Sequence, residues 1–276
     1  MHHKTIGVKV KDVINALERF APLPLQEEYD NAGLQLGLKE VEVSGALLCL
    51  DVTEDVLAEA VTLGCNMVIS HHPLLFRALK NITDATLSER CVRYALKHDL
   101  IIYSAHTNLD NAEGGVNAEA ARHLGLKDIQ FLQSNASGGG SGIFGVLDKP
   151  MKSIDFLQQV KSEFGVECLQ HNQPLSRPIH RVAFCGGAGD FLLNKAIAMG
   201  ADAFITGEMH YHLYFGHEER IQIAVLGHYQ SEQFTSQLLQ RILKEALPQL
   251  KTHLTQLSTN PIHYLKETNN VITHSI

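Results

Sequence analysis

The sequence places two adjacent histidines directly after an apolar run. Met67, Val68 and Ile69 predict a buried strand, and His71-His72 follow after a single serine. Ligands gather at the carboxyl ends of strands in open α/β sheets, and neutral imidazole is the commonest metal ligand in proteins. The pair therefore indicates one part of a metal site.

Two further segments share an H-x-x-x-[DE] pattern. His106 precedes Asp110 in SAHTNLD, and His228 precedes Glu232 in GHYQSE. Residues four apart lie on one face of a helix, so each pattern predicts an imidazole at a strand end and a carboxylate one turn into the next helix. Such a set exceeds the needs of one tetrahedral ion and suits two ions about 3.5–4 Å apart, bridged by a carboxylate and a water.

The residue types also define the chemistry. Nitrogen and oxygen ligands without thiolate fit zinc, manganese, iron or nickel, and they do not choose among these metals. Two cations that share a water lower its pKa enough to give hydroxide at neutral pH, which is the nucleophile of a hydrolytic step. Hydrolysis is therefore the reaction class that the residues indicate.

An internal duplication gives a reason why these distant residues would meet. Without gaps, residues 47–72 align with residues 183–208, and SAHTNLD aligns with GHYQSE, so the chain resembles two copies of a β-α-β-α-β unit. Two such units packed about a pseudo-twofold axis would direct their strand ends into one cleft. Glu208 takes the position of His72 in the second copy, so we expect it near the site without being a main ligand. His210 and His212 are further residues expected to line the cleft.

Strands that alternate with helices of about ten residues predict a three-layer α/β arrangement. Helices are expected at 10–20, 54–63, 88–98, 116–124 and 153–164, with strands at 46–50, 66–70, 100–104, 143–147 and 181–184. The stretch SNASGGGSG, residues 134–142, has the composition of a flexible linker that cannot pack. We place lobe 1 at residues 1–130 plus 226–276 and lobe 2 at residues 131–225.

Composition narrows the class of protein. The 276 residues can bury a large core, and 45% are hydrophobic, yet no apolar run reaches the roughly 18 residues of a membrane helix. Five cysteines without a C-x-x-C pattern suit core positions in a reducing compartment, and the first residues lack a secretory pattern, so we expect a cytoplasmic protein. A net charge of -7 weighs against nucleic acid as a partner.

Each motif has a less specific interpretation. A single histidine at a strand end is more often capped or solvated, and only the repetition of the pattern favours a site. The stretch CGGAGD, residues 185–190, could hold a phosphate through backbone N–H groups, but it lacks the third glycine of a dinucleotide motif, so a tight turn is preferred. No G-x-S-x-G is present. Four histidines are read as surface residues of the ends of the chain: His2, His3, His253 and His274.

With YDNAGLQLG, SHHPLLF, SAHTNLD and GHYQSE in this order, the chain resembles the interacting-factor-three-like dinuclear metal proteins, the GTP cyclohydrolase type 2 homologue family, over about residues 8–265. Tyr29 stands where the family usually has tryptophan. The resemblance implies two intertwined α/β lobes, two divalent ions per chain between them, and a ring-shaped homohexamer without the extra middle domain of some members. The implied metal ligands are His71, His72, Asp110, His228 and Glu232, with Glu232 as the bridge and His106 a close sixth.

Two classes of function follow. The first is a metal-dependent hydrolase, of which opening the purine ring of GTP is one form, with His106 or Glu208 as the catalytic residue that moves protons. The second is a protein that binds or delivers metal, or an adaptor ring, without catalysis. A ring threaded by DNA is disfavoured by the acidic balance.

Overall fold

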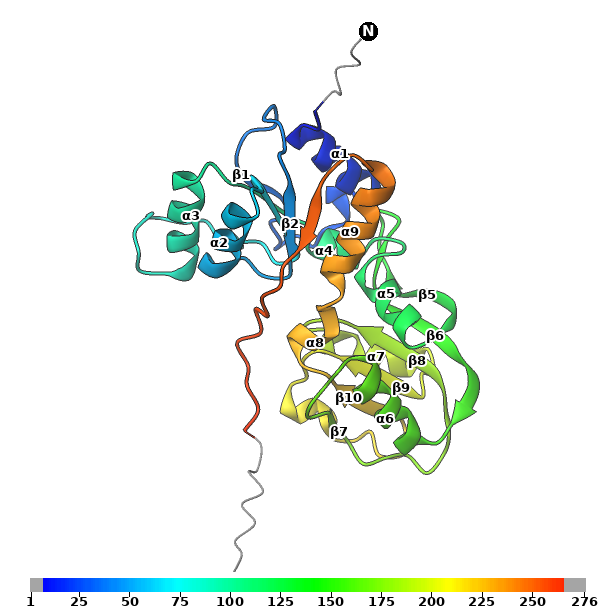
Figure 1. Ribbon diagram of the computed structural model, residues 1–276. Helices are drawn as coiled ribbons and strands as arrows, with labels where there is room; N and C mark the ends of the chain where they lie inside the picture. Colours follow the sequence, from blue (N-terminus) through cyan, green and yellow to red (C-terminus); the bar gives the residue numbers. More distant parts are fainter. Residues whose placement is uncertain (1–6, 266–276) are drawn as a thin grey trace, which may run out of the picture.

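The computed structural model describes residues 7–265, which form two lobes that are each built on one mixed sheet (Figure 1). The first sheet has the order β1 (Gly33–Leu36), β4 (Ile101–Ser104), β3 (Met67–Ser70), β2 (Ala46–Cys49) and β11 (Thr252–Leu254). The second has the order β5 (Lys127–Ser134), β6 (Gly140–Met151), β8 (Ile179–Cys185), β9 (Ala203–Thr206), β10 (Gln222–Val225) and β7 (Gln170–His171). The expected two-lobe α/β fold is confirmed.

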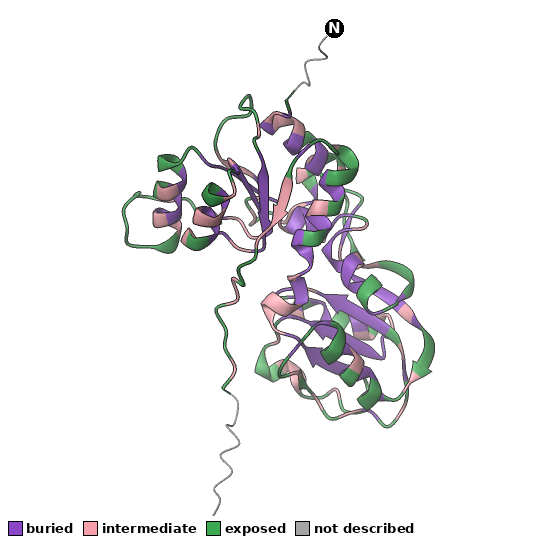
Figure 2. Cartoon of the chain, viewed as in Figure 1, coloured by how far each residue is buried: buried purple, intermediate pink, exposed green. Residues whose placement is uncertain are grey.

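Helices cover both faces of the first sheet because its central strands are apolar on both sides. Leu47, Val68 and Ile102 pack against α2 (Glu54–Thr62) and α3 (Leu87–Lys97). Their neighbours Leu48 and Ile69 lie in the core on the opposite face, which α1 (Val10–Phe20) and α9 (Thr235–Ala246) cover. Figure 2 shows the strands buried between the two helical layers. This is the expected three-layer arrangement.

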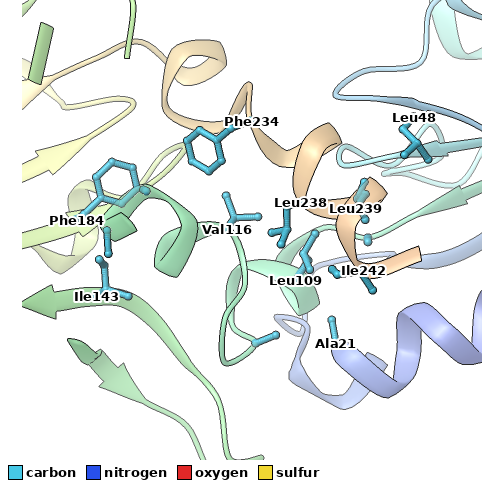
Figure 3. Packing of buried hydrophobic residues seen from close by; sticks show 14 of the residues in the cluster. Ala21, Leu48, Leu109, Val116, Ile143, Phe184, Phe234, Leu238, Leu239 and Ile242 are labelled. Atoms are coloured by element: carbon cyan, nitrogen blue, oxygen red, sulfur yellow. The ribbon is translucent and has the colours of Figure 1, made fainter. Parts of the chain in front are cut away.

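The two lobes share one continuous core. Leu48 of the first sheet and Phe184 of the second belong to the same buried cluster, which Leu238 of α9 and Val116 of α5 (Val116–His123) bridge (Figure 3). The inner face of the second sheet is completed by α6 (Ser153–Glu163), and its outer face packs on η2 (Asp190–Leu192) and α7 (Leu193–Ala198). The relative position of the lobes is therefore set by packing.

Strand registers confirm the duplication. In the first unit β2 pairs in parallel with β3, and Ala46 lies opposite Met67. In the second unit β8 pairs in parallel with β9, and Val182 lies opposite Ala203. Both partners are offset by the same 136 residues, as in the gapless sequence alignment, and the next three pairs follow the same rule. The two units thus superpose residue by residue along these strands.

The alignment of the two H-x-x-x-[DE] motifs differs from the structural equivalence by one residue. Ser104 and Val225 occupy equivalent register positions, and each is followed by a two-residue connection to a short helix, α4 (Thr107–Asp110) or α8 (His228–Glu232). His106 is therefore the residue before its helix, whereas His228 is the first residue inside it. The two imidazoles enter the site from adjacent rather than equivalent positions.

The glycine-rich stretch at residues 134–142 is the turn of the β5–β6 hairpin, so the prediction of a linker that cannot pack was wrong. Asn135 Oδ1 accepts hydrogen bonds from the backbone N–H groups of Ser137 (3.1 Å) and Gly139 (2.9 Å), and the N–H of Gly140 donates to Asn111 O at 3.0 Å. A Cβ on Gly139 would lie 2.2 Å from Asn111 O. The glycines permit close packing here, so their composition misled the sequence-based prediction.

The remaining elements are η1 (Leu23–Leu25) and η3 (Tyr211–Tyr214). His253 lies on the edge strand β11 rather than in a tail, and it is half-buried with its Nε2 inside; His2, His3 and His274 lie outside the described residues. The lobe boundaries after residues 130 and 225 stay a prediction. Among the described residues, none of the helices combines the length and apolar character needed to cross a membrane.

Replacing Gly139 by alanine should lower the free energy of unfolding by about 1–3 kcal/mol, because the added Cβ forces the hairpin away from Asn111. Ser137→Ala, in the same turn and exposed, serves as the control and should change stability little. Urea unfolding followed by circular dichroism measures both. Equal stabilities of the two variants would contradict the packing of this turn.

Candidate metal centre

Six side chains converge where the carboxyl ends of β3 and β4 meet helix α8. His71 and His72 follow β3, His106 follows β4, and Asp110 ends α4. Helix α8 brings the remaining two, His228 and Glu232, from the chain that follows the second sheet. Three groups of potential ligand atoms, each within 4.8 Å of one another, could hold a metal ion: His71, His72 and His106; His72, His228 and Glu232; and His71, Asp110 and Glu232. The structure therefore brings together the five predicted ligands and the predicted sixth.

The carboxylate of Glu232 lies at the centre of this cluster. Its Oε2 is 3.1 Å from His72 Nε2, 3.3 Å from His228 Nε2 and 3.9 Å from His71 Nε2. The side chain is only 5% exposed. One carboxylate oxygen thus faces three imidazole nitrogens from both structural units, which is the position that a bridging ligand requires.

Every imidazole of the cluster is oriented by an oxygen at its Nδ1. For His71 this oxygen is the Ala105 carbonyl (2.8 Å), and for His72 it is Asp51 Oδ1 (2.6 Å). The corresponding pairs for the other two rings are His106 with Asp30 (2.7 Å) and His228 with Glu208 (2.7 Å). An Nδ1–H held in this way directs the Nε2 lone pair into the cluster, as in metal sites whose histidines are supported by carboxylates or backbone carbonyls.

The donor set fits a metal ion. His71 is fully buried, and its Nε2 has no hydrogen-bond partner among the described residues, with Asp110 Oδ1 3.6 Å away. A buried nitrogen left unpaired costs about 1–3 kcal/mol. When Nδ1 of His72 or His228 carries the proton, the Nε2 of that ring is an acceptor. It then faces the Glu232 carboxylate, which is also an acceptor. Such pairs need a cation between them, and a divalent ion meets this need for all three imidazoles together.

In the absence of a metal, protons partly meet the same need. Burial alone would lower the pKa of His72, but hydrogen bonds with Asp51 and Glu232 raise it to about 10. The hydrogen bond with Glu232 raises the pKa of His228 to about 9, against the effect of burial. Burial would raise the pKa of Glu232, yet the contacts with His228 and His72 and the nearby charge of His71 hold it well below its usual range. The cluster thus strongly attracts positive charge.

Asp110 and Asp30 respond to different surroundings. Burial raises the pKa of Asp110, and the nearby Glu232 adds to this, because two carboxylates resist ionising side by side. Burial would also raise the pKa of Asp30, but hydrogen bonds from His106 and Thr107 bring it to about 2. Asp30 is therefore a carboxylate that accepts hydrogen bonds at the edge of the cluster, while Asp110 lies inside it.

Sequence reasoning missed the two aspartates that orient histidines. Asp51 comes two residues after β2, the neighbour of β3, so its position at the same sheet edge could have been recognised. Asp30 stands in the motif YDNAGLQLG, and its partner His106 is 76 residues away. No local pattern signals that pair, because the contact depends on how the loop after η1 packs against α4.

The two units differ at the same positions for a steric reason. His71 and Asp51 correspond to Gly207 and Gly187 in the second unit. A Cβ on Gly187, whose φ is +58°, would lie 2.6 Å from Glu232 Oε1, and one on Gly207 would lie 2.6 Å from Gly187 O. The second unit therefore carries glycine at both positions. Glu232 of α8 leaves no room for a side chain at position 187, and Gly187 O and Ser231 Oγ leave none at position 207.

The other predicted residues take distinct places. Glu208 lies beside the cluster, where its Oε1 accepts from His228 Nδ1, and its predicted catalytic role stays a prediction. His210 pairs with Asp190, and neither it nor the exposed His212 belongs to the clustered ligand groups.

The stretch CGGAGD forms the preferred tight turn. The N–H groups of Gly186, Gly187 and Gly189 donate to Asn117, Ser231 and Thr206 respectively. These three groups are therefore not free to hold a phosphate.

The fold and the cluster together define a two-lobe α/β protein with a buried histidine–carboxylate centre between two related units. The family model Duf34/NIF3 (NGG1p interacting factor 3) matches residues 8–261, and the chain belongs to this family. This confirms the resemblance seen in the motifs.

Relatives of known sequence agree with this membership. A protein of Clostridium perfringens named GTP cyclohydrolase 1 type 2 homolog is 36% identical over 228 residues, which cover 82% of this chain and 87% of the relative. A homologue of the same name from Streptococcus pneumoniae is 32% identical over 265 residues, which cover 92% of this chain and 98% of the relative. Among solved structures, a hypothetical protein of Staphylococcus aureus matches with a TM-score of 0.86 at 25% identity, covering 94% of this chain and all of that one.

Removing the carboxylate that orients His72 should weaken metal binding. We expect Asp51→Ala to lower the affinity for Zn²⁺ by about 10–100-fold, because His72 loses the oxygen that fixes its ring. Asp51→Asn should lower it less, since the amide oxygen still accepts from Nδ1–H. Competition with a chromogenic chelator measures the affinities, and Asp55→Ala, exposed on α2, is the matched control. An unchanged affinity in Asp51→Ala would contradict this role.

A second prediction concerns the room that Gly187 leaves for Glu232. Gly187→Ala should lower the zinc affinity at least about tenfold, because the added Cβ displaces Glu232 Oε1. Gly165→Ala is the matched control: its φ of +59° imposes the same backbone strain, and no atom lies within 4 Å of the new Cβ. Both variants should lose stability, and only Gly187→Ala should lose zinc. If both lost zinc equally, backbone strain alone would explain the effect.

Proposed function

We propose that the cluster holds two divalent metal ions and that the protein is a metal-dependent hydrolase. The proposed ligands are His71, His72, Asp110, His228 and Glu232, with Glu232 shared between the ions. The observation that carries the proposal is the single Glu232 oxygen that faces three imidazoles, one of which, His71, has a buried and unpaired Nε2. Zinc, iron, manganese and nickel all accept these donors.

When bound, a pair of divalent ions supplies hydroxide near neutral pH and polarises the bond to be cleaved. In hydrolysis of a carbon–nitrogen bond the oxygen of water joins the carbon, the bond to nitrogen breaks, and the nitrogen takes up a proton. His106 and Glu208 both line the cavity in front of the cluster. Asp30 orients His106 and His228 contacts Glu208, so these two residues are held where they can receive and return that proton.

The name of the relatives makes a purine nucleotide the first substrate to test. Opening the purine ring of GTP belongs to the proposed reaction class. A ring-shaped homohexamer in the cytoplasm is also part of this proposal, and it rests on the resemblance of the sequence motifs. A role in metal binding or delivery without catalysis would share the same ligands and differ only in lacking turnover.

The test combines elemental analysis with turnover by the full-length protein. Wild type should retain two ions per chain and release product from a panel of purine compounds and cyclic amides. His72→Ala and Glu232→Gln should each lose at least one ion and nearly all activity, because both contact the centre. His210→Ala replaces an exposed histidine outside the clustered groups and should keep both ions and full activity.

Two results would contradict the proposal in different ways. If His72→Ala and Glu232→Gln retained two ions, the ligand assignment would be wrong. If the metal-loaded wild type turned over none of the panel while binding two ions, the hydrolase would be rejected and the role of a metal-binding protein would remain.

A further inference from the structure

A cavity of about 520 Å³ opens in front of the cluster. Its polar end is formed by His72, His106 and His228, which belong to the proposed metal centre. The size is within the range of sites that bind small molecules, and it admits a free heterocycle as readily as a nucleotide. Volume therefore does not identify the ligand, and the chemistry of the walls must do so.

Most of the wall is apolar. Leu50 and Pro73 line it beside the histidines, Phe76 covers one side, and Pro261 and Ile262 of the C-terminal segment cover another. Phe76 and Ile262 are 41% and 54% exposed, so a ligand in the cavity would gain apolar contact by covering them. The ring of Phe76 meets the ring of His106 edge to face, with ring centroids 6.1 Å apart. Its other aromatic neighbour is Tyr29, at a centroid distance of 6.3 Å. An aromatic side chain beside a polar end suits a planar ring with polar edges.

Positive side chains are missing from these walls. Within residues 7–265, neither this cavity nor the two adjoining cavities that share His228 with it has a lysine or arginine in its lining. Arg77, next to Phe76 in sequence, is exposed and outside the lining. Proteins recognise phosphates with arginine, lysine or free backbone N–H groups. The three N–H groups of the adjacent glycine turn already donate within the protein.

Negative charge is abundant. Six carboxylates lie at the cluster and its cavities: Glu27, Asp30, Asp51, Asp110, Glu208 and Glu232. Two divalent ions would offset four of these charges, so the loaded site has no surplus of positive charge for a polyanion. Glu208 uses Oε1 for His228, and within the described part of the chain no hydrogen bond occupies its Oε2. That oxygen is available to accept a ring N–H.

We propose that this cavity binds a planar, uncharged heterocycle of nucleobase size and discriminates against the nucleoside triphosphate. This inference rests on the proposed function, since it takes the metal centre as loaded. The apolar wall around Phe76 packs on the ring, Glu208 accepts from its N–H edge, and the carboxylates repel a triphosphate. The substrate class of the hydrolase is then a cyclic amide-like ring without phosphate.

Calorimetric titration of the zinc-loaded full-length protein tests the proposal, with hypoxanthine, inosine and inosine triphosphate as probes. Hypoxanthine should bind at least about tenfold more tightly than the triphosphate. Phe76→Ala should weaken hypoxanthine binding about five- to tenfold through loss of ring packing, and Phe215→Ala, an exposed phenylalanine outside the cavity, should leave it unchanged. Ile262→Lys should narrow the difference in affinity between hypoxanthine and inosine triphosphate, because the added positive charge attracts the triphosphate.

The outcomes separate the two proposals, because zinc content is measured on the same samples. If two zinc ions are bound and the triphosphate binds as tightly as hypoxanthine, or hypoxanthine does not bind at millimolar concentration, the substrate class is wrong and the metal centre stands. Unchanged hypoxanthine binding in Phe76→Ala would also overturn the proposal. If zinc itself fails to bind, the proposed function fails first.

Discussion

Burial of the Glu232 carboxylate among three imidazoles is the interaction on which the arrangement of both lobes depends. A charge taken out of water is costly unless opposite charge and hydrogen bonds surround it. Here the compensation comes from His71 and His72 of the first unit and from His228 of α8. The contacts require the two units to meet with little freedom, and the continuous core from Leu48 to Phe184 provides that constraint.

The duplication explains both the symmetry and the asymmetry of the centre. Equal strand registers place the ends of β3 and β9 at equivalent positions. The second unit could therefore carry histidines after β9, as the first unit does after β3. Only one α8 carboxylate can occupy the middle, and the glycines at 186 and 187 give it room. The second unit therefore contributes space and a helix, while the first contributes the paired histidines.

Much of this could be read from the sequence because it depends on local patterns. Strands and helices follow apolar periodicity, and the residues of the cluster were singled out because an adjacent histidine pair and two H-x-x-x-[DE] patterns follow strands. Asp30 was missed because it meets His106 only through the packing of a loop 76 residues away, whereas the place of Asp51 after β2 could have been recognised. Residues 134–142 were read as flexible because composition records that glycine can move, whereas the close approach of Asn111 shows why glycine is required.

The edge strand β11 has a consequence for the order in which the chain can fold during synthesis. The second sheet is built from one continuous stretch, residues 127–225, and it can be complete as soon as that stretch has left the ribosome. The first sheet begins earlier in the chain, yet the apolar face under α9 stays uncovered until residue 246 has been made, and the sheet lacks β11 until residue 254 has been made. The lobe whose sheet carries the paired histidines is thus the last to close, and α8 arrives just before it does.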